Sequence, residues 1–180
     1  MRSAYFQLVQ GLKSHMAESS NAKQIRWFWK RLWSLKVPTK CKHLLWQAYT
    51  ASLPTRLGLR KKGVHIDTNC LLCDYQEETT THILWACPLA RNVWALAPGK
   101  SQKMPNTEDA EFWDLTFALA SANSIIELED WTLLTWAIWN ARNKFIFEGH
   151  QDHPSHIFHT PCTLFQEYQQ ITLRSRLIPP

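Results

Sequence analysis

Apolar residues recur with helical spacing in the first third of the chain. Ile25, Phe28, Trp29, Leu32 and Trp33 stand at i, i+3, i+4, i+7 and i+8. This spacing puts them on one stripe of an amphipathic α-helix, with cationic residues on the other side. The pattern predicts a helix that buries one aromatic face and exposes a basic one.

The same offsets return after Pro38, at Cys41, Leu44, Leu45, Ala48 and Tyr49. A second amphipathic helix is therefore predicted, with Cys41 as a small core residue and not as a metal ligand.

Further along the chain, capping residues mark two more helices. Thr55 is suited to the N-cap of a short basic helix, and Gly63 to the position after its end. Ser124 and Glu127 have the spacing of a capping box, which would open a longer helix that stops at Gly149. A helix preceding this one is expected to have its N-cap and first-turn acids at residues 107–109.

Beyond Gly149, polar residues and prolines predict a loose tail, in which residues 163–173 are a candidate helix. We therefore expect a zinc-binding domain over residues 1–99, a helical spacer over 100–149 and a loosely ordered tail over 150–180. The fold class predicted is mainly α: a small helical domain with a CCHC zinc-binding knuckle, followed by a helical extension.

Composition supports this fold class and limits where the protein works. The 180 residues include only 5 Gly and 9 Pro, which disfavours many short strands joined by tight turns. No apolar run approaches the roughly 18 residues of a membrane span, and no secretory leader is evident. The odd number of cysteines, 5, fits a reducing compartment better than a disulfide framework. We expect an intracellular protein, in the nucleus or the cytoplasm, without a membrane partner.

The net charge of +5 is distributed unevenly. Residues 19–66 contain 11 Lys or Arg and no Asp or Glu, so this segment carries +11 and the rest of the chain −6. Such a stretch of one sign favours a polyanion or an acidic protein as partner. The candidate nucleic-acid contacts are Lys23, Arg26, Trp27, Lys30, Arg31, Lys40, Lys42, Arg56, Arg60, Lys61 and Lys62.

Trp27 and Trp46 lie among these cations, off the apolar stripes, and two interpretations stay open. Each indole could stack on an unpaired base while neighbouring cations hold phosphates. Each could equally pack against another element with an Arg over its ring, and buried Trp is common enough to favour packing.

Four residues have the spacing of a metal site. Cys70 and Cys73 are followed by His82 and Cys87, in the pattern C-x2-C-x8-H-x4-C. Two Cys separated by two residues can form a tight knuckle, and the His and third Cys would complete a tetrahedral zinc site. Four protein ligands leave no open position, so the predicted Zn2+, one ion, is structural and not catalytic.

The step from His82 to Cys87 does not suit one α-helix, since five residues rotate the side chain by about 140° from the starting position. Pro88 favours a new helix beginning there. We therefore expect His82 near the end of one short element and Cys87 at the start of the next. A zinc deaminase would need H-x-E, and Ile83-Leu84 follows His82 instead.

A second group of histidines, His150, His153, His156 and His159, recurs every third residue. Histidine-rich tracts can bind metal, but Pro154 interrupts this one, and a solvated linker is the favoured interpretation.

Together these residues resemble a known family, the zinc-binding domain that follows the reverse transcriptase in plant LINE-type (non-LTR) retrotransposons. The resemblance covers about residues 3–97. Its motifs are Ser3-Ala4-Tyr5, Leu32-Trp33, Val37-Pro38-x-Lys40, Leu45-Trp46, Leu53-Pro54-Thr55, Cys70 and Cys73, Glu78-Thr79, His82, Cys87 and Trp94. Trp139-Asn140-x-Arg142-Asn143 and Phe147 look like the spacer that precedes a ribonuclease H domain in these elements.

The resemblance implies an accessory module of a mobile element, with Cys70, Cys73, His82 and Cys87 as zinc ligands. The chain begins within the module and lacks the paired carboxylates of a ribonuclease H core, so we expect a fragment or a domesticated remnant of a retrotransposon polyprotein. Other parts of that polyprotein are candidate partners.

Three functions follow as hypotheses. The first is a non-catalytic module that binds RNA or DNA non-specifically, through phosphates, using the basic helices. The second is a protein-interaction scaffold whose basic face meets an acidic protein, and the third is a remnant without retained function. An enzyme is not expected, because no suitable cluster of acids is present.

Overall fold

The computed structural model describes residues 21–97, 111–122 and 124–177. Helices dominate these residues, and the only β pairing among them is an isolated antiparallel bridge between Asn69 and Glu77. The prediction of a mainly α fold is confirmed. The chain divides into two compact units, Met1–Leu35 and Lys36–Pro180.

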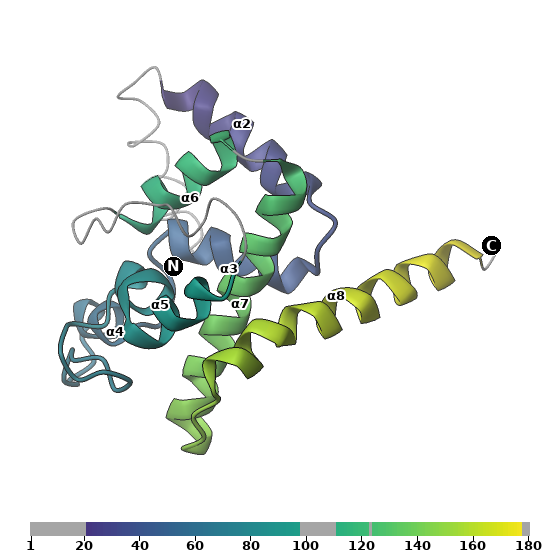
Figure 1. Ribbon diagram of the computed structural model, residues 1–180. Helices are drawn as coiled ribbons and strands as arrows, with labels where there is room; N and C mark the ends of the chain where they lie inside the picture. Colours follow the sequence, from purple (N-terminus) through teal and green to yellow (C-terminus); the bar gives the residue numbers. More distant parts are fainter. Residues whose placement is uncertain (1–20, 98–110, 123, 178–180) are drawn as a thin grey trace, which may run out of the picture. The chain divides into compact units, whose positions relative to one another are not determined.

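The first unit contains helix α2, Asn21–Ser34 (Figure 1). Its predicted apolar stripe is largely correct, because Ile25, Phe28 and Leu32 are buried. Trp29 is half-buried, whereas Trp33 remains 42% exposed and does not belong to the buried stripe.

The second unit holds the remaining described helices. In chain order these are α3 (Thr39–Tyr49), α4 (Arg56–Lys61), the π-helical turn η1 (His82–Ala86), α5 (Pro88–Ala95), α6 (Phe112–Ala122), α7 (Ile125–Glu148) and α8 (Pro154–Leu177). Helix α7 runs through the middle of this unit and contacts α3, α6, α8 and η1 (Figure 1).

Capping residues explain where several of these helices begin and end. The Thr55 hydroxyl accepts a hydrogen bond from the Gly58 amide, and Ser124 and Glu127 form the predicted capping box of α7. Gly63 (φ 90°) follows the end of α4, and Gly149 ends α7 at φ 67°, both in the left-handed region that glycine adopts without strain. The predicted N-cap at residues 107–109 lies outside the described residues.

An aromatic cluster forms the core between η1, α5, α6 and α7. Trp131 of α7 is 2% exposed, and its ring centroid lies 4.2 Å from Trp94, 5.4 Å from Trp85 and 6.3 Å from Phe112. The Trp94 indole N–H donates to the Leu84 carbonyl at 2.9 Å, which ties α5 to η1. Aromatic side chains therefore connect α7 directly to the segment that carries His82 and Cys87.

The helix expected over residues 163–173 lies within α8, but the rest of the loose-tail prediction is wrong, because the helix already begins at Pro154 and continues to Leu177. Pro154 occupies the first helical position, where the missing N–H costs nothing, and Ile157 and Pro161 are buried. Packing of α8 against α5 and α7 thus compensates for the hydrogen bond lost at Pro161. The prediction of three domains, with boundaries after residues 99 and 149, stays a prediction, because packing alone does not test independent folding.

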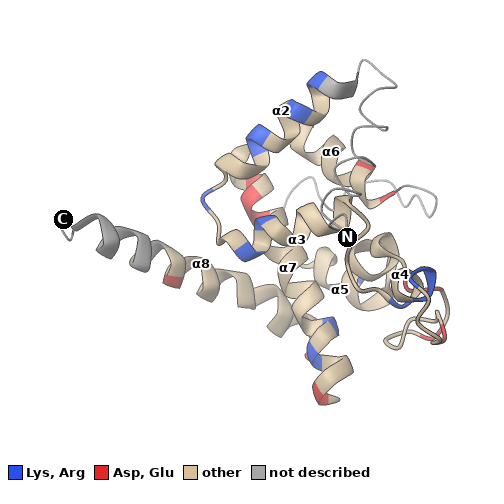
Figure 2. Ribbon diagram, turned by 180° about the vertical axis from the view of Figure 1, so that it is seen from behind, with Lys and Arg blue, Asp and Glu red and all other residues tan. Residues whose placement is uncertain are grey.

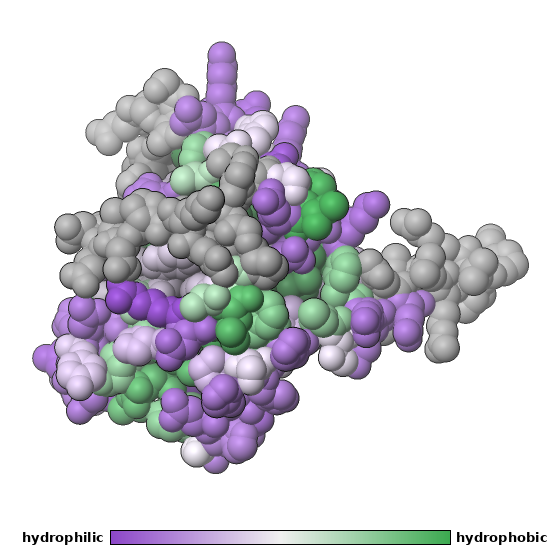
Figure 3. Space-filling view, viewed as in Figure 1, coloured by the Kyte–Doolittle hydropathy of each residue, from purple (hydrophilic) through white to green (hydrophobic). Residues whose placement is uncertain are grey.

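Polar and apolar side chains are interspersed on the surface in Figure 3, and Tyr75 and Phe147 are among the most exposed apolar residues. Within the described residues, no helix has the length and apolarity needed to cross a bilayer.

Candidate metal centre and basic surface

Cys70 and Cys73 lie at the tip of a short hairpin that the Asn69–Glu77 bridge closes. The Cys70 amide donates to the Gln76 carbonyl at 2.8 Å, and the Asp74 amide donates to the Cys70 carbonyl at 2.7 Å. Asp74 takes a left-handed conformation (φ 58°) that reverses the chain directly after Cys73. The turn that the Asp74–Cys70 hydrogen bond closes keeps Cys73 close to Cys70.

His82 and Cys87 are brought together by a π turn, which the sequence did not reveal. The Cys87 amide donates to the His82 carbonyl at 2.7 Å, so one turn closes over five residues instead of four. Cys87 then caps α5, with Pro88 as its first residue, as predicted. The prediction for His82 is wrong: it begins the π turn and does not end an element, because only a wider turn can align residues five apart.

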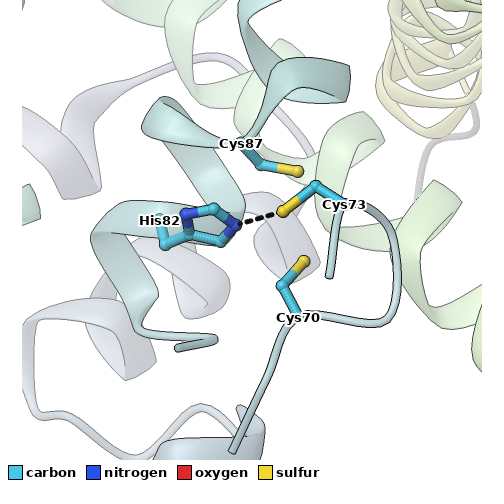
Figure 4. A group of neighbouring side chains, drawn as sticks. All are labelled: Cys70, Cys73, His82 and Cys87. Carbon is cyan, nitrogen blue, oxygen red and sulfur yellow. Dashed lines mark hydrogen bonds between the residues drawn. The ribbon is translucent and has the colours of Figure 1, made fainter. Parts of the chain in front are cut away.

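The four predicted ligands converge. One ligand atom from each of Cys70, Cys73, His82 and Cys87 lies within 4.8 Å of all the others. The Cys73 Sγ and His82 Nε2 atoms are 3.3 Å apart, and all three sulfurs point towards the same space (Figure 4). Cys70, His82 and Cys87 are buried and Cys73 is half-buried. This is the only such group among the described residues.

The donor set fits zinc. Three thiolates and one imidazole are a common ligand set of structural Zn2+ sites, and ligand atoms within 4.8 Å of one another are close enough to share one ion. Gln76 adds a supporting contact, because its Oε1 lies 3.0 Å from His82 Nδ1. An Nδ1–H donated to this amide oxygen would leave Nε2 unprotonated and directed at the sulfurs, which is how zinc-binding histidines are usually oriented.

The electrostatics of the cysteines also favour a cation. The hydrogen bond from Cys87 lowers the pKa of Cys70 well below its usual range, although burial opposes this shift. The same hydrogen bond, burial and the neighbouring Cys70 thiolate raise the pKa of Cys87 well above its usual range. These opposed shifts arise because the two thiols lie against each other, and a bound divalent cation would favour the thiolate form of both.

The candidate nucleic-acid contacts on α2 are mostly exposed. Lys23, Arg26 and Lys30 are exposed, and Figure 2 shows the cationic positions along this helix. Trp27 is 42% exposed, and the Arg31 guanidinium lies 5.6 Å from its ring centroid. This cation–π contact lies within α2 and leaves the ring exposed, so both interpretations of Trp27 stay open.

The candidate nucleic-acid contacts on α3 and α4 differ from one another in exposure. The Lys40 ammonium lies 4.2 Å from the centre of the Trp136 ring, and Lys42 is half-buried. Arg56 is half-buried and donates its backbone N–H to Glu78, whereas Arg60, Lys61 and Lys62 are exposed at the end of α4. Trp46, which was open to two interpretations, is half-buried.

Sequence reasoning missed a buried ion pair beside the metal centre. Glu78 is fully buried and pairs with Arg142 of α7, which is 3% exposed. The two residues are 64 positions apart, and no local pattern links them. Their only sequence signal is that each belongs to a motif of the family resemblance, Glu78-Thr79 and Trp139-Asn140-x-Arg142-Asn143.

The histidine tract is not a linker throughout, since residues from Pro154 onwards belong to α8. His150 and His156 instead contact one carboxylate, that of Asp152, at 3.1 and 3.0 Å. Lys144 Nζ lies 3.1 Å from the same carboxylate. Burial raises the pKa of Asp152, but the contacts with Lys144, His156 and His150 outweigh it and lower the pKa overall. The ammonium makes this cluster a poor place for a metal ion.

The reactivity of Cys41 tests the prediction that this thiol is a core residue and not a metal ligand. It is fully buried in α3, and desolvation raises its pKa to about 11 although Lys40 lowers it. In the native protein we expect Cys41 to resist iodoacetamide at pH 8 for as long as the fold persists, because little thiolate is present. Cys162, which is exposed, should react within minutes. Mass mapping of alkylated peptides would measure both, and rapid labelling of Cys41 would contradict the burial.

The chain was also compared with known proteins. Neither a comparison with curated proteins nor one with solved structures gives a match. Residues 1–94 match a family described as zinc-binding in reverse transcriptase. The match covers more than half of the chain and includes all four convergent residues. The chain therefore belongs to the family of reverse transcriptase zinc-binding domains, whose role is that of an accessory and not a catalytic domain.

Proposed function

We propose that this chain is a non-catalytic nucleic-acid-binding module, shaped by one structural zinc ion and derived from the polyprotein of a plant LINE-type retrotransposon. In this proposal, Cys70, Cys73, His82 and Cys87 hold the ion, and the basic helices that precede the hairpin bind the phosphates of RNA or DNA. Residues 139–147 correspond to the spacer that precedes ribonuclease H in such elements.

The observation that carries the proposal is the long segment of one charge that precedes the candidate metal ligands in the sequence. Of the cations in residues 19–66, those at Lys23, Arg26, Lys30, Lys36, Lys40 and residues 60–62 are exposed. Exposed Lys and Arg without intervening acids suit contacts with phosphates, which are independent of sequence. Family membership adds support, because a domain of reverse transcriptase works beside nucleic acid.

Binding should depend steeply on salt. Fluorescence anisotropy with labelled single-stranded RNA and duplex DNA, at 50 and 200 mM salt, would measure the slope of log K against log salt. Each phosphate contact contributes about 0.7 to 0.9 to that slope. The double variant Lys61→Gln/Lys62→Gln should weaken binding to all sequences alike and lower the slope by about 1 to 2.

The matched control is Lys100→Gln/Lys103→Gln, which removes the same charge from outside the basic segment. This control should retain nearly the affinity of the wild-type protein. Equal losses in both variants would mean that only net charge matters, and an affinity unchanged between the two salt concentrations would contradict the proposal. Binding that heparin displaces and nucleic acid does not would favour the scaffold for an acidic protein.

A further inference from the structure

Arg142 lies outside the family-matched segment, yet its side chain ends beside the metal-binding hairpin. Its guanidinium pairs with both carboxylate oxygens of Glu78, and the contact to Oε2 measures 3.4 Å. It also donates to the Pro54 carbonyl at 3.4 Å and to Asn143 Oδ1 at 2.9 Å, and it lies 4.9 Å from the centre of the Trp139 ring. These contacts hold the guanidinium in one place on α7.

Glu78 in turn connects the supports of the metal centre. Its carboxylate accepts the Arg56 amide at 2.9 Å, and its carbonyl accepts the Leu57 amide at 3.3 Å, so it fixes the start of α4. Its own amide donates to the Thr68 carbonyl at 2.8 Å, at the base of the hairpin that carries Cys70 and Cys73. A displacement of Glu78 would therefore move that base.

The segment after Glu78 leads directly to the second pair of ligands. The hydroxyl of the next residue, Thr79, accepts the His82 amide at 2.9 Å and so sets the start of the π turn. Glu78 thus stands between the two ligand pairs, five residues after Cys73 and four before His82. Its buried carboxylate is held in place by Arg142, the only cationic side chain whose contact with it is found among the described residues.

We propose that Arg142 is a positioning residue for the metal centre: through Glu78 it holds the Cys70–Cys73 hairpin and the His82–Cys87 turn in register. The metal site then depends on α7 as well as on the family-matched segment. Supporting residues of this kind typically change metal affinity by about 10- to 100-fold when they are removed. The coupling is reciprocal, so zinc should also stabilise the part of α7 around Arg142.

The first test measures Zn2+ affinity of the full chain by competition with a chromogenic chelator. Arg142→Met should bind Zn2+ about 10- to 100-fold more weakly than the wild-type chain, and Arg142→Lys should recover part of that loss. The matched control is Lys144→Met. Lys144 lies on α7 two residues after Arg142, and its replacement breaks a different ion pair, the one with Asp152. This control should leave Zn2+ affinity unchanged. Equal affinity of Arg142→Met and the wild type, or an equal loss in both Met variants, would overturn the proposal.

A second measurement uses only the wild-type chain and so does not depend on the folding of Arg142→Met. Hydrogen exchange of the wild-type chain with and without Zn2+ should show slower exchange in peptides that cover residues 139–143 when zinc is bound. Unchanged exchange there, with protection confined to residues 68–90, would also overturn the coupling. Neither experiment involves nucleic acid, so their failure is distinguishable from failure of the proposed function. If the wild-type chain binds no Zn2+, the metal centre itself is refuted.

Discussion

Replacement of Cys70 by Ser should remove one equivalent of zinc and unfold the hairpin and the π turn. Structural zinc contributes about 10–16 kcal/mol of apparent binding free energy in small zinc domains, which is comparable with the whole stability of a domain at about 5–15 kcal/mol. A loss of even about 5 kcal/mol would lower the Tm of a chain of this length by about 10–20 °C. Metal analysis of the purified protein and thermal unfolding by circular dichroism would measure both effects.

Cys162→Ser is the matched control, because it makes the same chemical change at an exposed position on α8. It should keep the zinc content and the Tm of the wild-type protein. His82→Ala should behave like Cys70→Ser. If Cys70→Ser retained a full equivalent of zinc, the four converging side chains would not be the metal ligands.

Replacement of Trp131 by Ala should lower the free energy of unfolding by about 3–5 kcal/mol, as expected when a large aromatic side chain is deleted from a core. Trp131 is 2% exposed and stacks on Trp94 at 4.2 Å, and Trp94 holds the carbonyl of Leu84 in the π turn. The expected decrease in Tm is about 6–20 °C. Urea unfolding, followed by far-ultraviolet circular dichroism, would give the free energy directly.

Trp136→Ala removes a half-buried indole from the same helix and serves as the comparison. The Trp136 ring contacts the Lys40 ammonium. Because this indole is only half-buried, Trp136→Ala should lower the free energy of unfolding clearly less than Trp131→Ala. Equal destabilisation by the two substitutions would show that the aromatic cluster around Trp131 does not form the core of this unit.

Local features of the fold were predictable because their physical causes lie within a few residues of each other. The hydroxyl of Thr55 and the capping box of Ser124 and Glu127 satisfy amide groups three residues away. The left-handed Gly149 ends α7 by a purely local conformational preference. The convergence of the candidate metal ligands was likewise predictable from spacing, because a C-x2-C knuckle and a nearby His and Cys are characteristic of zinc sites.

Features that depend on distant contacts were not predictable. Nothing near Glu78 indicates that Arg142 neutralises its carboxylate, and nothing near Pro161 indicates that packing on α5 and α7 would sustain a helix there. The two prolines of α8 point to a loose tail when only the sequence is considered, because proline disfavours helix interiors unless burial compensates. The π turn was missed for another reason: the sequence gives the number of residues between two ligands but not the kind of turn that spans them.

That kind of turn has a consequence for recognising related sequences. In an α turn the partner of a residue is four positions away, and in the turn from His82 to Cys87 it is five. A relative with one residue fewer between these ligands would present the same imidazole and sulfur from an ordinary α-helix. A search pattern that insists on a single interval would discard such relatives although their coordination chemistry is unchanged.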